Sequence, residues 1–182
     1  MSIAEQLDTT IPAGTWTSDA VHSRVSFAIK HMGVAEFHGA FSKVVATLTA
    51  ERLTGSVRIG EIRLDDDPDQ EGHVLSPDFF DAERFPEATF ASTAIRRSGD
   101  ELEVEGELTV KGTSRPVSLT GTIAGPTADP YGNERIGLVL TTTVDRRDFD
   151  VSWNAPLPGG GQAIEWDVVL TANLQFTHAE QA

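Results

Sequence analysis

ELEVEGELTV, residues 101–110, carries the clearest signal of the fold in this chain. Its apolar side chains, Leu102, Val104, Leu108 and Val110, alternate with acidic and polar ones, and Gly106 interrupts the alternation. A period of two residues is typical of a β-strand with one face buried and the other in water. A glycine inside such a pattern is typical of a bulge or of a bend in a barrel wall. The stretch therefore predicts a curved antiparallel strand.

The same period recurs along the chain, at residues 24–30, 117–123, 136–144 and 164–176. Clusters of turn-forming residues at 98–100, 112–116 and 125–133 separate several of these segments. Strands at this spacing, mostly without helices between them, predict an antiparallel meander, and the pattern leaves open whether it closes as a barrel or stacks as a sandwich. Between Leu53 and Leu64 the inward phase is also open, because Val57 and Ile59 compete with Ile62 and Leu64 across an expected bulge at Gly60.

One segment predicts a short helix, near residues 77–85. Ser76 has the side chain of a helix N-cap, Pro77 suits the first helical position, and Pro86 ends the segment. Its phenylalanines, Phe79 and Phe80 among them, require an apolar surface, and the mouth or flank of a barrel offers one.

Composition excludes several classes of function. The chain has 182 residues, a net charge of −14 and no cysteine. The charge disfavours nucleic acids and anionic membrane surfaces, and the lack of cysteine excludes disulfides, thiolate nucleophiles and cysteine-bound metals. No apolar run reaches the length of a membrane span, and residues 1–14 lack the pattern of a signal peptide. We expect a frayed tail at 1–14, one domain at 15–178, no stable membrane anchor and a cytoplasmic location.

The search for reactive groups favours structural explanations. His31 and His38 flank a predicted turn and are a conceivable metal pair, although histidines that hydrogen-bond locally at strand ends are the favoured interpretation. The acidic run at 65–71 lacks the glycine and the final glutamate of a calcium loop. Asp19, His22 and Ser23 have the side chains of a triad, but their spacing favours a local capping network. We therefore predict no catalytic residues, no metal site and no cofactor.

Aromatic residues are spread over nearly every predicted strand, with nine Phe and three Trp in all. The simplest interpretation is that they fill a core. An eight-stranded antiparallel barrel is, however, just wide enough either to be filled by side chains or to hold one small ligand. Periodicity does not distinguish a filled barrel from a hollow one.

An ordered set of motifs resembles the YceI-like family. The set comprises WTSDAVHS (16–23), VSFAIKHM (25–32), GAF (39–41), HVLSPDFFD (73–81), FPEATFAS (85–92), GELTVKG (106–112), PVSL (116–119), DPYGNERIG (129–137) and RDF (147–149). The resemblance runs from about Trp16 to Phe176. It implies an all-β, elongated, antiparallel lipocalin-like barrel, often dimeric, with an apolar tunnel that binds polyisoprenoid chains or fatty-acid-like lipids.

The chain departs from the family pattern at three places. Gln70, Glu71 and Gly72 precede His73 where the family usually has Arg-Asp, which argues against a charged contact to a head group. Asp150 stands where a glycine is common. Trp166 is unusually bulky for its strand, and the sequence leaves open whether the barrel is hollow or is shortened or plugged by this residue.

The resulting prediction is a non-enzymatic protein that carries, stores or sequesters a polyisoprenoid or another long-chain amphiphile. Strand phase and position in the family pattern together select the predicted lining, which is Phe27, Ile29, Phe41, Val57, Phe79, Phe80, Phe90, Leu119, Leu138, Leu140 and Trp153. His22, Arg24 and Asn154 are predicted polar contacts near an opening. Each buried CH₂ contributes about 0.8 kcal/mol, so the lining should dominate affinity, and the net charge argues that a ligand is held by its tail.

Two alternatives from other classes remain. One is a small enzyme that uses Asp19, His22 or His31 as acid or base on an apolar substrate. The other is a structural or interaction module with a solid barrel. A hollow or filled interior separates the binding protein from the solid module.

Overall fold

The computed structural model describes residues 9–65 and 67–178. Within these ranges the strands form one antiparallel sheet. Their bounds are Trp16–Ser18 (β1), Arg24–His31 (β2), Ala35–Phe41 (β3), Val45–Leu48 (β4), Leu53–Arg58 (β5), Ile62–Leu64 (β6), Glu87–Ser98 (β7), Glu101–Val110 (β8), Thr113–Ala128 (β9), Glu134–Asp145 (β10) and Ile164–His178 (β11). Three 3-10 turns, Ile59–Glu61 (η1), Pro68–Gln70 (η2) and Arg146–Phe149 (η3), and the helix Glu71–Leu75 (α1) complete the elements.

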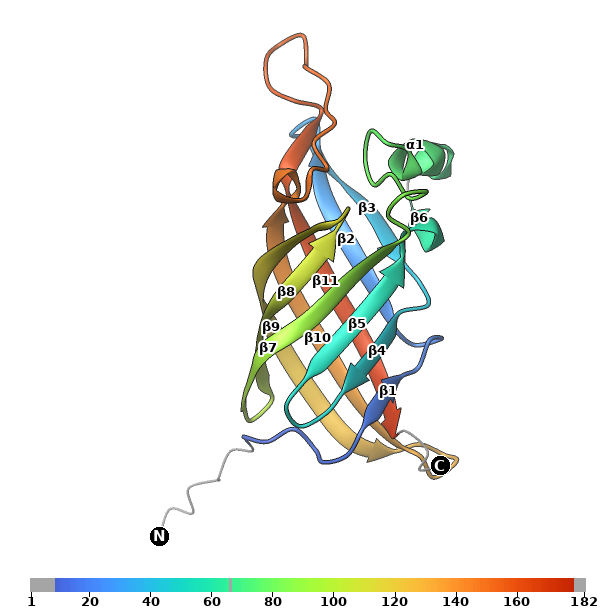
Figure 1. Cartoon of the computed structure of the whole chain (residues 1–182), viewed down its shortest axis with the longest axis vertical. Helices are drawn as coiled ribbons and strands as arrows, with labels where there is room; N and C mark the ends of the chain where they lie inside the picture. The colour runs from blue at the N-terminus through green and yellow to red at the C-terminus, as the bar shows by residue number, and fades with distance from the viewer. Residues whose placement is uncertain (1–8, 66, 179–182) are drawn as a thin grey trace.

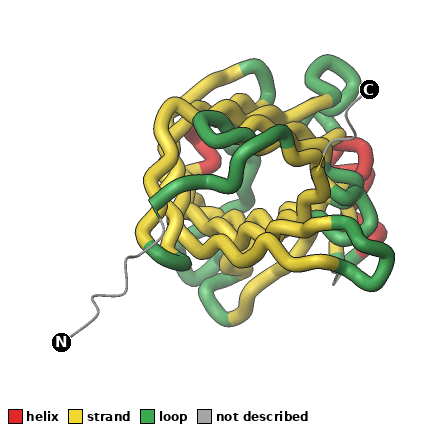
Figure 2. Tube along the Cα trace, turned by 90° about the horizontal axis from the view of Figure 1, so that it is seen from below, coloured by secondary structure: helices red, strands yellow, loops and turns green. Residues whose placement is uncertain are grey.

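The sheet closes on itself as an elongated eight-stranded barrel (Figure 1). The pairs β1 and β2, β3 and β4, and β5 and β6 are each two pieces of one barrel strand that bends on the way. Closure comes from β11, which pairs with β10 along one edge and with β1 and β2 along the other. Seen along the barrel, the strands form a ring (Figure 2). The meander is therefore a barrel and not a sandwich.

Both competing phases of the segment 53–64 point inward. Leu53 and Ile59, at odd positions, are buried, and so are Ile62 and Leu64, at even positions. On one regular strand, odd and even positions would face opposite sides of the sheet. The 3-10 turn η1 lies between β5 and β6 and shifts the phase by one residue. The irregularity expected at Gly60 is thus present as a 3-10 turn.

The short helix is displaced from its predicted position. It covers Glu71–Leu75 and ends at Ser76, where we expected a helix to begin, and residues 77–85 form a series of turns. Ser76 is extended, and its hydroxyl donates to the His73 carbonyl at 2.6 Å. A residue before proline avoids the helical region, so Ser-Pro fits the end of one helix as well as the start of another. No helix in the described ranges is long and apolar enough to cross a membrane.

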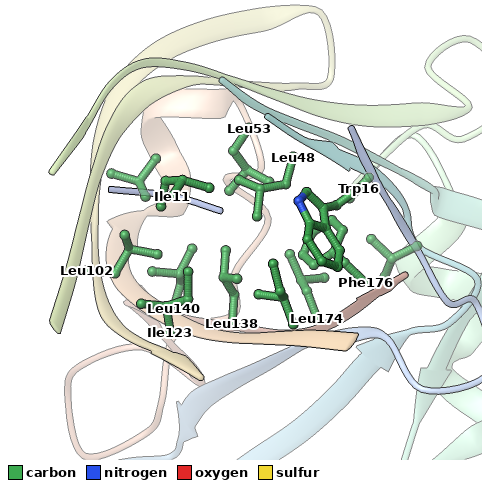
Figure 3. Packing of buried hydrophobic residues seen from close by; sticks show 14 residues of the cluster. Ile11, Trp16, Leu48, Leu53, Leu102, Ile123, Leu138, Leu140, Leu174 and Phe176 are labelled. Atoms are coloured by element: carbon green, nitrogen blue, oxygen red, sulfur yellow. The ribbon is translucent and has the colours of Figure 1, made fainter. Parts of the chain in front are cut away.

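The lower end of the barrel is filled by side chains (Figure 3). Trp16, Leu48, Leu138 and Phe176 are at most 1% exposed and belong to one packed cluster contributed by several strands. We call this region the packed end. The opposite end carries α1, the turns after it and the long connection between β10 and β11 (Figure 1).

The segment before β1 contributes to the packed end. Residues 1–8 of the predicted frayed tail lie outside the described residues. In the described part, Ile11 is buried in the packed cluster, and the Thr10 carbonyl accepts from Arg97 Nη1 at 2.7 Å. The indole of Trp16 donates to the Pro12 carbonyl at 3.2 Å and lies 3.7 Å from the His178 ring. Within a segment expected to fray, Thr10, Ile11 and Pro12 therefore make contacts at the lower end of the barrel.

Candidate functional site

The upper part of the barrel encloses a cavity of about 720 Å³. Its wall is almost entirely apolar and takes inward-facing side chains from most strands, among them Val25, Ile29, Leu119, Val144 and Leu170. A volume of this size lies in the range of pockets that hold one small-molecule ligand. The barrel is therefore hollow, which decides against the solid module.

The packed end forms the floor of this cavity. Five residues belong both to the packed cluster and to the cavity wall: Val44, Ala46, Leu53, Leu140 and Leu174. Each is at most 5% exposed. Below them Leu138, on the same face of β10 as Leu140, is fully buried and does not line the cavity. The cavity is thus a well with one closed end.

Two glycines keep aromatic rings out of the middle of the well. Gly39 is the cross-strand partner of Phe27, and a Cβ at Gly39 would lie 2.3 Å from Phe27 Cζ. A Cβ at Gly106 would lie 2.4 Å from Phe90 Cζ. Cross-strand neighbours share one face of the sheet, so each ring lies against the wall over a residue that has no side chain. The two phenyl groups line the cavity without filling it.

An aromatic cluster bridges the mouth of the well. His73 on α1 makes edge contacts with Phe79, at 5.1 Å between centroids, and with Trp153, at 4.8 Å. Phe79 and Trp153 are 5.3 Å apart, and His73 Nε2 lies 3.0 Å from the Asp78 carboxylate. The cluster joins the segment between β6 and β7 to the connection between β10 and β11.

Arg146 fixes the other side of the mouth. This residue of η3 is only 5% exposed, and its guanidinium donates to the carbonyls of Val151, Trp153, Ile164 and Glu165 at 2.7–3.2 Å. Burial lowers the pKa of Arg146, but an arginine side chain stays protonated at neutral pH. Four carbonyl dipoles therefore surround a buried charge and hold both ends of the connection that borders the mouth.

The comparisons with known proteins agree with this architecture. The model of the YceI-like domain matches residues 16–176. The chain belongs to the YceI-like family. It is 31% identical to the protein YceI of Escherichia coli O157:H7 over 136 residues, 71% of each chain, and 31% identical to YceI of Salmonella arizonae over 137 residues, 72% of each.

Solved structures show the same fold. The crystal structure of Burkholderia cenocepacia BcnA superposes with a TM-score of 0.70 at 27% identity, covering 87% of this chain and 98% of BcnA. A polyisoprenoid binding domain from Saccharophagus degradans, implicated in plant cell wall breakdown, superposes with a TM-score of 0.71 at 12% identity, covering 92% and 100%. At 12% identity the second likeness shows the fold alone.

Most of the lining predicted for a YceI-like barrel borders the cavity. The residues found there are Phe27, Ile29, Phe41, Val57, Phe79, Phe80, Phe90, Leu119, Leu140 and Trp153. Leu138 is the exception and lies below the floor. The sequence reasoning missed Val168, Leu170, Ala172 and Leu174 on β11, which the same period of two would have identified.

The predicted polar contacts lie elsewhere or are already engaged. His22 and Arg24 are exposed at the packed end, opposite the mouth. Asn154 is near the mouth, but its side chain donates to the Ile164 carbonyl at 2.6 Å and accepts from the backbone of Ala155 and Ile164. It closes a loop. Arg146 and the glycines Gly39 and Gly106 were not predicted, because their roles depend on contacts between distant segments.

Trp166 does not plug the well. Its ring lies between two guanidinium groups, 4.5 Å from that of Arg146 and 4.8 Å from that of Arg147, and it does not border the cavity. Trp166 has the same strand phase as Ile164 and Val168, but it lies where the pairing of β11 with β2 is irregular, and its ring packs against the two arginines. Of the two alternatives that the sequence leaves open for Trp166, the structure has the open well.

The residues proposed for acid-base chemistry do not meet at one site. Asp19 accepts from Val21 N at 2.9 Å and Arg135 Nη1 at 2.8 Å and contacts His22 Nδ1 at 2.8 Å, as a capping network does. Hydrogen bonds from His22 and then Arg135 hold the pKa of Asp19 well below its usual range. His31 borders the cavity at the opposite end of β2. His38 pairs with Ala28 and not with His31, so the hairpin does not form the conceivable metal pair.

Proposed function

We propose that this protein binds a polyisoprenoid or another long-chain amphiphilic lipid in the barrel cavity, without catalysis, and carries, stores or sequesters it. The observation that supports the proposal most directly is the enclosed apolar well of about 720 Å³. A polyisoprenoid-binding domain with the same fold provides further support.

The wall predicts how the ligand is held. Almost all of its side chains are hydrocarbon, so the affinity arises from burial of the chain at about 0.8 kcal/mol per CH₂. Polar groups border the cavity near its mouth, for example Gln70, His73 and Arg146. A ligand therefore places its tail toward the floor and its polar end toward the mouth.

The cytoplasmic location and the homodimer stay predictions.

The experiment begins with protein purified without detergent. Organic extraction followed by mass spectrometry should recover a long-chain lipid, and delipidated protein should bind a fluorescent long-chain probe with saturable 1:1 stoichiometry. A variant that fills the well, Val57→Trp, should lose the probe while keeping its cooperative unfolding. No extracted lipid together with no probe binding by delipidated protein would overturn the proposal.

A further inference from the structure

The well has a measurable depth because one end is closed. On β11 the wall runs from Ile164 at the mouth to Leu174 at the floor. Ten residues at about 3.3 Å, on a strand tilted by about 40°, correspond to a depth of roughly 25 Å. An extended carbon chain with bonds of about 1.5 Å and angles near 111° advances about 1.25 Å per atom. The well therefore accommodates on the order of 20 main-chain carbons.

The cavity volume gives a second, independent measure of this capacity. If each chain carbon takes about the 30 Å³ that a water molecule occupies in the liquid, 720 Å³ holds about 24 carbons. About 24 carbons in total are just under five isoprene units, which have 20 main-chain carbons, so the estimate from volume agrees with the estimate from strand geometry. Both describe one extended chain and exclude a chain of twice that length lying wholly inside.

The floor resists deeper insertion. Leu140 is fully buried and Leu174 is 5% exposed, and both pack against the cluster that includes Trp16 and Phe176. A chain that reached below them would have to displace side chains that are already close-packed, which costs free energy. Carbons beyond the limit must instead remain at the mouth, where burial adds little to the affinity.

We propose that the floor is a ruler that limits the buried part of the ligand to about 20 main-chain carbons, equivalent to five isoprene units. Leu140 and Leu174 are the specificity-determining residues. The proposal rests on the proposed function, since it names the class of chain that the same cavity selects. Up to the limit, each added CH₂ strengthens binding from water by about fourfold, and beyond the limit the gain ends.

The test is a competition for delipidated protein. An equimolar mixture of prenyl alcohols with three to eight isoprene units is equilibrated with each variant, and the bound species are counted by native mass spectrometry. Because every variant draws on the same mixture, the free energy of the unbound alcohols cancels between variants. Wild-type protein should show a profile that stops rising near five units.

Two sets of variants move the floor in opposite directions. The double variant Leu140→Ala/Leu174→Ala deepens the well and should raise the bound ratio of six-unit to five-unit alcohol by about tenfold. Ala46→Leu raises the floor and should shift the limit toward four units. Leu138→Ala is the matched control, because it removes the same side chain from the same face of β10 without bordering the cavity, and it should leave the profile unchanged.

The outcomes separate this proposal from the proposed function. Failure of wild-type protein to bind any of the alcohols while it binds the long-chain probe contradicts the ruler, and failure to bind both contradicts lipid binding itself. Binding with a profile that still rises at eight units, or with no shift in Ala46→Leu relative to Leu138→Ala, contradicts the ruler alone. If the double variant does not fold, Ala46→Leu decides, since it removes no packing from the cluster.

Discussion

The two ends of the barrel are made from the same strands yet differ in what fills them. On β10, Leu138 in the packed end is fully buried, whereas Val144 near the mouth borders the cavity. In the packed end the large rings of Trp16 and Phe176 belong to one buried cluster with side chains of β4, β8, β9 and β10. In the upper part, the Phe27 ring lies over Gly39, its cross-strand partner. The same alternating strand pattern therefore builds both the packed end and the hollow end. The hollow end differs in that its large rings lie over glycines, which have no side chain.

The largest expected effect contrasts a phenylalanine from each end. Phe176→Ala should lower the free energy of unfolding by about 3–5 kcal/mol, because it leaves a void in close-packed surroundings. Phe27→Ala should cost less than half as much, since its ring already borders open space. Denaturant unfolding of both variants measures the difference. Equal losses would contradict the distinction between a packed and a hollow end.

Next in size is the effect of removing the buried charge at the mouth. Arg146→Met leaves four carbonyls without their donor and should lower stability by roughly 2–4 kcal/mol. The connection at 150–163 should then become the first site of limited proteolysis. Arg147→Met is the matched control, because that side chain is half-exposed and pairs with Asp145 at the surface, where ion pairs contribute little. Similar cleavage in both variants would contradict the role of Arg146.

A smaller effect follows from adding one methyl group to the wall. Gly39→Ala should push the Phe27 ring into the cavity, lower stability by about 1–3 kcal/mol and weaken binding of the long-chain probe. Phe27→Leu in the same chain should restore binding. Gly55→Ala is the control, since the nearest atom to its added Cβ lies 3.7 Å away, an ordinary contact. Loss of probe binding in the control as well would show that the pairing with Phe27 is not the cause.

The smallest effect concerns the surface of the packed end. Arg135 donates to Asp19 at 2.8 Å and to Asp129 at 2.9 Å, and hydrogen bonds from Asn133 and Arg135 lower the pKa of Asp129 from 3.8 to about 2. A depressed pKa stabilises the fold above pH 4, and this contribution is lost as the pH falls from about 4 toward 2. Arg135→Gln should move the midpoint of acid unfolding to higher pH. An unchanged midpoint would contradict this.

Sequence reasoning predicted the strands well because alternation is a local property. The stretch 101–110 is a strand over its whole length, and its interrupting Gly106 lies under the Phe90 ring. The prediction was weaker where one short sequence motif fits two different local structures. Ser76-Pro77 suits both the end and the start of a helix, and here it ends one.

The strands, the acidic composition and the lack of cysteine chemistry all follow from the amino-acid sequence, and its ordered motifs indicate the family. Its alternation also selected most of the cavity wall, because residues two apart on a strand must share a face. The tertiary structure alone decided that the barrel is hollow above and filled below, that Leu138 lies under the floor and Leu140 on it, and that Trp166 lies between two arginines. These features depend on which side chains from distant strands meet across the barrel. A local sequence pattern contains no information about such contacts.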